Sequence, residues 1–321
     1  MVNLESFSAR RAAIIYNPVA RGLSRHMSML QRSTALLAKQ GIEAKLVATT
    51  APGSAGAQTK REIEAGCDLI VAAGGDGTIN EVIEGMLHTA IPLAILPGGT
   101  ANVLAREMRI PIHIGKAAAQ ISALEPCRIA LGSIRLSDSA TRCFVCMTGA
   151  GLDAEIVYRL NLDLKALAGK LAYYVSGFAQ VLRPLREFRV TVDGHQYEAS
   201  FALVSRVRNY GGDLEIARGA SLLRDDFEIV LFRGTVSARY LGYLAGVAAR
   251  QVHRMKGCTV VHGRSVTCLP VNSNGIYVQV DGELAGKLPA SIELIPDALT
   301  LLVPAKYMKR ERALLTTPAY A

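Results

Sequence analysis

The sequence lacks the features that mark membrane-spanning, secreted and disulfide-stapled proteins. No apolar stretch reaches the roughly 18 residues that cross a bilayer, and residues 1–11 hold no apolar run of the signal-peptide type. Six cysteines in 321 residues do not form a disulfide framework. These absences predict a cytoplasmic protein that touches membranes only from outside.

Metal-binding and redox patterns are scarce as well. The six histidines show no metal-ligand spacing. Cys143 and Cys146 form a CxxC, but they lie in a short apolar run, which favours cysteines packed in the core over a metal or redox site. There are no internal repeats and no low-complexity linker.

The net charge of +9 is compatible with nucleic acid, an anionic membrane surface or an anionic substrate as partner. Arginines and lysines are scattered rather than clustered with aromatic residues, which argues against nucleic acid. A solvated basic surface without a single partner stays open as an alternative.

The first third of the chain alternates short apolar strands with helical stretches. We predict strands at 12–16, 43–49, 68–73 and 92–96, and helices at 27–40, 55–65 and 79–87. Strands that are apolar on both faces and alternate with helices are typical of a parallel sheet with both faces covered.

From about residue 128 the pattern changes to strands separated by turns, which indicates an antiparallel sandwich. We predict strands at 128–136, 142–148, 188–192, 197–207, 227–232, 264–269 and 275–280, interrupted by helices around 154–182 and 237–255. The expected domains are an α/β domain at 1–128 and an all-β sandwich domain at 129–297. Residues 305–321 are expected to form a basic tail.

The strongest chemical signal is Gly74-Gly75-Asp76-Gly77-Thr78, directly after one predicted strand and before a helix. Glycines let the backbone approach a phosphate, and the helix N-terminus offers N–H groups and a positive dipole end. The carboxylate of Asp76 would be repelled by polyphosphate unless a cation such as Mg²⁺ intervenes or the carboxylate orients an acceptor hydroxyl.

A second glycine loop, Pro97-Gly98-Gly99-Thr100-Ala101-Asn102, follows the next predicted strand and again opens a helix. The carboxyl ends of neighbouring parallel strands are where ligands bind in open α/β sheets. Thr100 and Asn102 offer a hydroxyl and an amide that suit phosphate or ribose.

These two loops, GGDGTINEV and LPGGTANVLA, resemble the catalytic domain of diacylglycerol kinases and sphingosine kinases, particularly the soluble bacterial lipid kinases. Further segments resemble motifs of that family in the same order. They are Asn17-Pro18 with Gly22, Thr49 with Gly53, Gly149–Ala154, and Asp281-Gly282-Glu283.

The resemblance implies an ATP-dependent kinase of a lipid hydroxyl, with Mg²⁺, an α/β nucleotide domain, a β-sandwich domain and an active site in the cleft. It also implies that a final strand, 298–304, returns to the first domain. Glu283 is the implied general base, with Asp281 and Asp76 as further catalytic residues. The implied nucleotide-binding residues are Asn17, Thr49, Gly74, Gly75, Asp76, Gly77, Thr78, Asn80, Gly99, Thr100 and Asn102.

The geometry of Asp281-Gly282-Glu283 agrees with a role of this motif in phosphoryl transfer. Asp281 and Glu283, two residues apart at a strand end, can point the same way. Phosphoryl transfer needs positioning, charge neutralisation and one carboxylate to accept the hydroxyl proton. A plain hairpin turn is the alternative for these three residues.

One segment departs from the family. Bacterial relatives hold a structural Mg²⁺ on an Asp-Asp-Gly segment, whereas residues 223–228 read LRDDFE, without the glycine. The corresponding candidates are Leu223, Asp225 and Phe227; an acidic turn without metal stays open.

The stretch 164–182 is helical in period and either packs on the sandwich or lies at the headgroup level of a membrane. NAD kinases share the GGDGT turn, and a non-catalytic nucleotide-binding protein is a further alternative. The sequence leaves the particular lipid and the oligomeric state open, a homodimer included.

Overall fold

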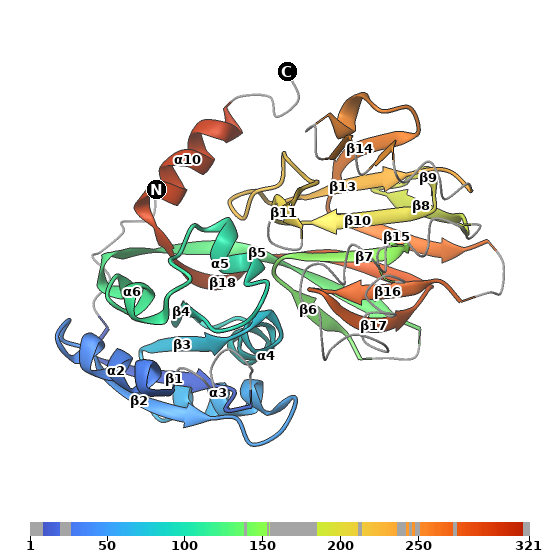
Figure 1. Cartoon of the computed structure of the whole chain (residues 1–321). Coiled ribbons are helices and arrows are strands. Elements are labelled where there is room, and N and C mark those ends of the chain that lie inside the picture. Colours follow the sequence, from blue (N-terminus) through green and yellow to red (C-terminus); the bar gives the residue numbers. More distant parts are fainter. Residues whose placement is uncertain are drawn as a thin grey trace. The chain divides into compact units, whose positions relative to one another are not determined.

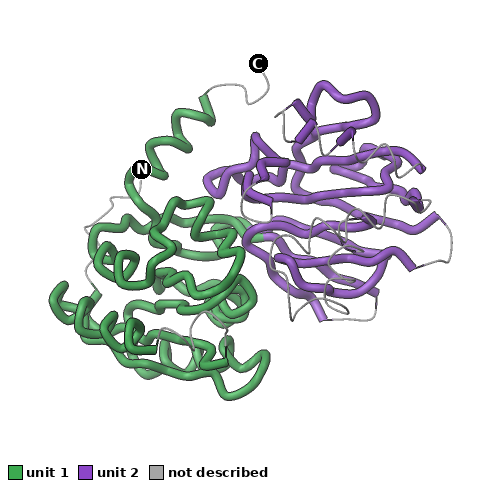
Figure 2. The backbone as a smooth tube through the Cα atoms, in the orientation of Figure 1, with its two compact units in different colours: residues 1–131, 296–318 green, residues 132–295, 319–321 purple. Residues whose placement is uncertain are grey.

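The computed structural model describes residues 9–19, 27–137, 140–152, 154, 185–210, 214–235, 242–243, 246–247, 251–271 and 275–316. The chain divides into two compact units, shown in Figure 2. The first unit comprises residues 1–131 and 296–318, and the second comprises residues 132–295 and 319–321. Two long strands, β5 (Leu124–Leu136) and β18 (Ala290–Pro304), contribute residues to both units.

The first unit is built on a parallel sheet. Its strands run in the order β2-β1-β3-β4-β18, with β4 pairing in parallel with the end of β18. The four N-terminal strands are β1 (Arg11–Tyr16), β2 (Glu43–Ala48), β3 (Leu69–Gly74) and β4 (Pro92–Pro97). Every residue of β3 is buried because this strand is apolar on both faces and central in the sheet.

Helices connect these strands (Figure 1). They are α2 (Met27–Ala38), α3 (Ser54–Glu64), α4 (Asp76–Met86), α5 (Val103–Glu107) and α6 (Ile114–Ala118), followed by a 3₁₀ turn at Ile121–Ala123. α3 packs on α4, and α2 packs on α6. The alternation of strands and helices is the predicted α/β architecture.

The second unit is an antiparallel sandwich. One sheet has the order β14-β13-β10-β7-β16-β17, and the other includes β5, β6, β8, β9, β15 and the start of β18. Their bounds are β6 (Arg142–Phe144), β7 (Met147–Gly151), β8 (Phe188–Val192), β9 (His195–Ala199), β10 (Phe201–Ser205), β13 (Phe227–Phe232), β14 (Cys258–Gly263), β15 (Ser265–Pro270), β16 (Tyr277–Val280) and β17 (Glu283–Lys287). A short pair, β11 (Asn209–Tyr210) and β12 (Leu214–Glu215), and a 3₁₀ turn at Val252–Arg254 complete it.

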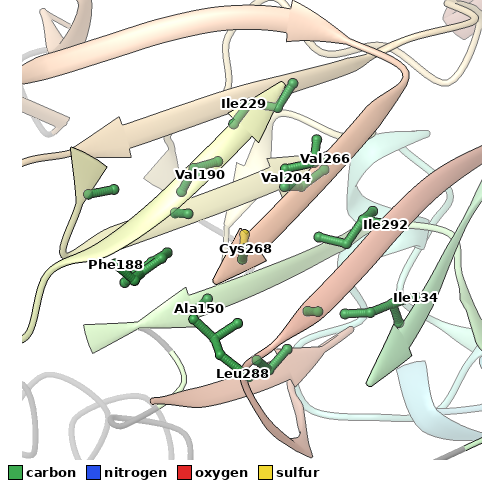
Figure 3. Packing of buried hydrophobic residues seen from close by; sticks show 14 of the residues in the cluster. Ile134, Ala150, Phe188, Val190, Val204, Ile229, Val266, Cys268, Leu288 and Ile292 are labelled. Carbon is green, nitrogen blue, oxygen red and sulfur yellow. The ribbon is translucent and has the colours of Figure 1, made fainter. Parts of the chain in front are cut away.

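The core of the second unit lies between its two sheets. Figure 3 shows Val204 and Ile229 of one sheet in the same cluster as Val190, Val266 and Ile292 of the other. Cys143 and Cys146 are buried, as predicted for core cysteines. The predicted fold class, a mostly parallel α/β domain plus an antiparallel β domain, is confirmed.

Two predicted strands are interrupted. The run 142–148 breaks at residues 145–146 into β6 and β7, and the run 197–207 breaks at Ser200 into β9 and β10. The Ser200 hydroxyl donates to the Gly234 carbonyl at 2.7 Å, which fixes the bend. β14 and β17 were not predicted as separate strands.

The C-terminal segment was predicted as a basic tail, which was wrong for most of its length. Residues Ala305–Leu315 form helix α10, and its Tyr307, Met308 and Glu311 are buried. Arg310 bridges Glu311 and the buried Glu107 of α5, with Nη2–Oε1 distances of 2.8 and 3.4 Å. The many charged residues on the exposed face made this amphipathic helix look like a polar tail, although its other face packs against the first unit.

None of the helices that the structure describes has the length and apolar content that a membrane crossing requires. The predicted helix at 154–182 lies outside the described residues except for residue 154. Of the predicted helix at 237–255, residues 242–243, 246–247 and 251–255 are described, and Val252–Arg254 form a 3₁₀ turn.

Candidate active site

Four loops meet at one edge of the first unit's sheet. Asn17 follows β1, Thr49 follows β2, and the two glycine loops follow β3 and β4. The register of the parallel strands aligns their carboxyl ends, and the Thr49 N–H donates to the Tyr16 carbonyl at 2.8 Å. The predicted nucleotide-binding segments are therefore brought together at the edge where open α/β sheets bind ligands.

The two glycine loops touch each other. The Gly98 N–H donates to the Gly74 carbonyl at 2.8 Å. A Cβ on Gly99 would lie 2.5 Å from the Gly75 Cα, and a Cβ on Gly74 would lie 2.8 Å from the Thr78 Cβ. A side chain at Gly99 would force the two loops apart, and one at Gly74 would collide with Thr78 inside the first loop, so both positions require glycine.

Asp76 joins the two loops. It lies in the first turn of α4, and its Oδ1 accepts the Val103 N–H, in the first turn of α5, at 2.8 Å. Burial raises the pKa of Asp76, while backbone N–H groups of Val103, Leu104 and Asn102 act to lower it. The carboxylate caps α5, which leaves it poorly placed to hold a metal ion directly.

Asn102 and Asn80, both predicted to bind the nucleotide, are buried. The Asn102 amide accepts the Gly99 N–H and donates to the Gly99 carbonyl, both at 2.8 Å, and the residue is buried with a left-handed φ of 48°. Asn80 is buried in α4. Asn102 shapes the second loop from inside, whereas Thr100 is exposed and free to meet a ligand.

Glu81 is a positioning residue that the sequence reasoning missed. Its carboxylate accepts the N–H groups of Gly53 and Ala55, at 3.0 and 3.1 Å, at the start of α3. α3 and α4 approach closely there, because a Cβ on Gly85 would lie 2.3 Å from the Gly56 carbonyl oxygen. Glu81 thereby fixes the loop that carries Thr49. The sequence could have indicated this role, because Glu81 lies within the GGDGTINEV motif.

In the second unit, Asp281-Gly282-Glu283 forms a tight hairpin between β16 and β17. Asp281 and Gly282 have left-handed φ values of 45° and 83°. The Asp281 carboxylate accepts the N–H groups of Val145, Cys146 and Met147 at 3.0, 3.0 and 2.8 Å. These bonds explain the break between β6 and β7, and they make Asp281 a structural anchor.

Glu283 begins β17 and differs from Asp281 in exposure. Its side chain is 58% exposed, and its Oε2 lies 3.5 Å from Nη2 of Arg142 on β6. Asp281 and Glu283 thus have different surroundings, and strand alternation does not apply in a turn with left-handed residues. Of the two residues, Glu283 is the more exposed.

Arginines already bind several groups of the candidate metal segment. Asp226 forms short bonds of 2.6 and 2.5 Å with Arg224, and the Asp225 carbonyl accepts from Arg264. Burial acts to raise the pKa of Asp226, but hydrogen bonds from Arg224 and His262 hold it well below its usual range. Among the described residues no cluster of three His, Cys, Asp or Glu side chains could hold a metal.

Some predicted motif residues cannot be placed. Gly22, Asp153 and residues 211–213 lie outside the described residues, as does the stretch 164–182. Gly149–Gly151 of the glycine motif belong to β7, which pairs with β10 and β16.

Comparison with known proteins identifies the class. Residues 11–134 match the diacylglycerol kinase catalytic domain, and residues 146–303 match the YegS C-terminal NAD kinase beta sandwich-like domain. Together these regions define a lipid kinase with an α/β catalytic domain and a sandwich domain. The chain belongs to the diacylglycerol kinase family, and the prediction that it is a lipid kinase is confirmed.

Relatives match along nearly the whole chain. Diacylglycerol kinase from Staphylococcus epidermidis is 28% identical over 94% of this chain and 95% of its own length. The enzyme of the same name from Staphylococcus saprophyticus is 29% identical over 92% of this chain and 96% of its own. A crystal structure of a diacylglycerol kinase from Bacillus anthracis has the same fold, with a TM-score of 0.76, 24% identity and coverage of 94% and 99%.

Proposed function

We propose that this protein transfers the γ-phosphoryl group of ATP to the hydroxyl of a membrane lipid, with diacylglycerol or a related lipid alcohol as acceptor. Relatives of near-equal length are named diacylglycerol kinase. The observation that carries the proposal is the contact between two glycine loops at the carboxyl edge of a parallel sheet. That arrangement suits a polyphosphate, because bare backbone can approach it closely.

In this proposal the first unit binds the nucleotide. The backbone N–H groups of Gly74–Thr78 and the N-terminus of α4 attract the phosphates. Asn17, Thr49 and Thr100 line the neighbouring loop ends and serve the remainder of the nucleotide. Asp76 and Glu81 hold these loops in place through the bonds they accept from α5 and α3.

Glu283 is the proposed general base. It accepts the proton of the lipid hydroxyl as the oxygen attacks the γ-phosphorus, and ADP leaves with the electrons of the broken P–O bond. Its exposure supports this role, since a base must reach the substrate. Asp281 anchors the hairpin that presents Glu283.

Mg²⁺ is proposed to enter on the phosphates of the nucleotide. Bound there, it would supply positive charge against the phosphate oxygens. Asp76 is the carboxylate within the two glycine loops. Its hydrogen bond from the Val103 N–H of α5 argues against direct coordination of Mg²⁺ by this side chain.

The proposed location is the cytoplasmic surface of a membrane, approached from outside the bilayer. The net charge of +9 supports attraction to anionic lipid headgroups. The acceptor lipid is drawn from that surface.

Incubation with γ-labelled ATP, Mg²⁺ and vesicles tests the proposal. Separate vesicles would carry diacylglycerol, phosphatidylglycerol or a sphingoid base, and NAD in solution would be a further arm. Labelled phosphatidic acid is the expected product, and it should be nearly absent with E283Q. Labelled NADP without any lipid product would overturn the proposal.

A further inference from the structure

The loop that leads into β13 is organised around a buried arginine. Arg206 follows β10, and its side chain is fully buried. Its Nη1 donates to the carbonyls of Arg224 and Asp226 at 2.5 and 2.8 Å, and its Nη2 donates to the carbonyl of Leu222 at 3.0 Å. Three carbonyl oxygens of one loop thus converge on one positive charge.

A second arginine binds the same loop from the turn between two other strands. Arg264, between β14 and β15, donates from Nε to the Asp225 carbonyl at 2.7 Å. The Asp226 carboxylate is bound by Arg224, and Nδ1 of His262 lies 3.5 Å from it. The carbonyls of residues 222, 224, 225 and 226 therefore have arginine partners, and the Asp226 carboxylate has an arginine and a histidine beside it.

Converging carbonyl oxygens beside carboxylates are also what hard divalent cations select. A guanidinium can fill the same place, because it is permanently charged and offers five donors in a rigid fork. Once it is buried there, a divalent ion would face its charge, and it would have to break hydrogen bonds that buried carbonyls need.

The local charges are already matched. Arg206, Arg224 and Arg264 lie on or against the segment that carries Asp225, Asp226 and Glu228. Adding an ion of charge +2 to this balance would leave an excess of positive charge in a half-buried site.

We propose that Arg206 takes the place of a structural divalent cation, so that the loop 222–226 is held by the chain's own guanidinium groups and binds no Mg²⁺. The family resemblance implies a structural Mg²⁺ at Leu223, Asp225 and Phe227. The arginines bind the interleaved carbonyls of residues 222, 224, 225 and 226, and it is their fixed positive charge beside the implied ligands that argues against an ion there. The fold of the second unit is then independent of divalent ions, and any Mg²⁺ requirement of the enzyme belongs to the nucleotide.

Thermal unfolding of the full chain without nucleotide tests this directly. The melting temperature should be the same in EDTA and in millimolar MgCl₂, with KCl used to match ionic strength. Asp225→Asn should leave that comparison unchanged. A saturable rise of the melting temperature with Mg²⁺ that Asp225→Asn abolishes would overturn the proposal.

Arg206→Met tests whether loss of the guanidinium creates a dependence on divalent ions. It removes the charge and keeps much of the volume, so the freed carbonyls and the unbalanced carboxylates should create a cation dependence that the wild type lacks. We expect a lower melting temperature that MgCl₂ partly restores. Arg189→Met, at an exposed position of β8, is the matched control and should change neither value.

Arg206→Lys covers the case in which Arg206→Met does not fold. It keeps a charge but not the fork, and it should melt below the wild type without any response to Mg²⁺. If Arg206→Met and Arg206→Lys both melted at the wild-type temperature, the Arg206 hydrogen bonds would not hold the loop 222–226, and the proposal would be overturned.

Discussion

Two Asp-Gly hairpins in the second unit have nearly the same backbone and different surroundings. Asp193-Gly194 joins β8 to β9 with φ values of 44° and 87°, and Asp281-Gly282 joins β16 to β17 with 45° and 83°. Both aspartates accept backbone N–H groups from another segment, Asp193 from Arg264 and Ser265. The turn and its aspartate are therefore a structural device that the sandwich uses twice.

The residue after each glycine makes the difference. His195 follows Gly194, whereas Glu283 follows Gly282 and presents an exposed carboxylate beside Arg142. The comparison indicates that Glu283 supplies the reactive carboxylate of the second hairpin, whereas Asp281 fixes the hairpin's position. The following variants test that division, from the largest expected effect to the smallest.

Glu283→Gln should lower kcat by about 10² to 10⁴, the usual contribution of a positioned general base. The amide keeps the shape of the side chain but cannot take up the hydroxyl proton. Melting temperature and ATP affinity should stay at the wild-type values, since the side chain is exposed. Steady-state kinetics at saturating lipid, with an ATP titration, measures the effect.

Glu198→Gln is the matched control for that variant. Glu198 lies on β9 after the other hairpin, is 56% exposed, and is paired with Arg233. It should retain full turnover. Equal losses in the two variants would show that surface charge, not a base, is being measured.

Asp281→Asn should destabilise the protein by about 1–3 kcal/mol, the cost of unsatisfied buried donors. An amide oxygen can accept some of the N–H groups at residues 145–147, but its NH₂ faces another donor. Denaturant unfolding gives the stability. Asp193→Asn should have a similar stability loss, yet only Asp281→Asn should also reduce kcat, because only it displaces Glu283.

Gly282→Ala and Gly194→Ala compare the two turns alone. A Cβ at either position meets nothing within 4 Å, so strain from the left-handed φ is the expected cost. Each should lose about 1–2 kcal/mol, and the two losses should agree. A much larger loss at one turn, measured by thermal unfolding, would show that the hairpins are not equivalent.

Asp76→Asn extends the comparison to the first unit and should have the smallest effect on stability. The amide oxygen can still accept the Val103 N–H, and the charge that burial opposes is removed. Because the pKa of Asp76 is raised by folding, the ionised form costs stability at neutral pH. The variant should match or exceed the wild-type melting temperature, with its advantage growing as pH rises above about 4.

Turnover of Asp76→Asn should still fall, though less than in Glu283→Gln, because the charge lies beside the phosphate-binding glycines. A marked drop in melting temperature would instead show that its carboxylate is an essential cap of α5. Full turnover would remove the charge of Asp76 from the mechanism.

The sequence was sufficient for the fold class and for most strands of the first unit, because β3 and β4 are apolar runs flanked by glycine loops. It could not separate the roles of residues within a motif. Asn102 and Thr100 are two positions apart and both polar, yet one is buried against Gly99 and the other is exposed. Which polar side chain turns inward depends on the left-handed φ at residue 102.

The contacts of Arg206 with the loop 222–226 could not be predicted from the sequence either. Arg206 is adjacent to the predicted strand end and looked like one scattered basic residue among many. Its role depends on carbonyls at residues 222–226, which sequence cannot orient. The breaks at residues 145–146 and 200 likewise come from long-range hydrogen bonds, not from local composition.

The passage of β18 from the second unit back to the first has a consequence for biosynthesis. Residues 298–303 supply the strand beside β4, and Ala298, Leu299, Leu301, Leu302 and Val303 are completely buried. A ribosome makes them only after it has made residues 132–295 of the second unit. Until then the nascent first unit carries an open, apolar sheet edge of the kind that invites aggregation. The nucleotide unit therefore completes its folding last, although it is synthesised first.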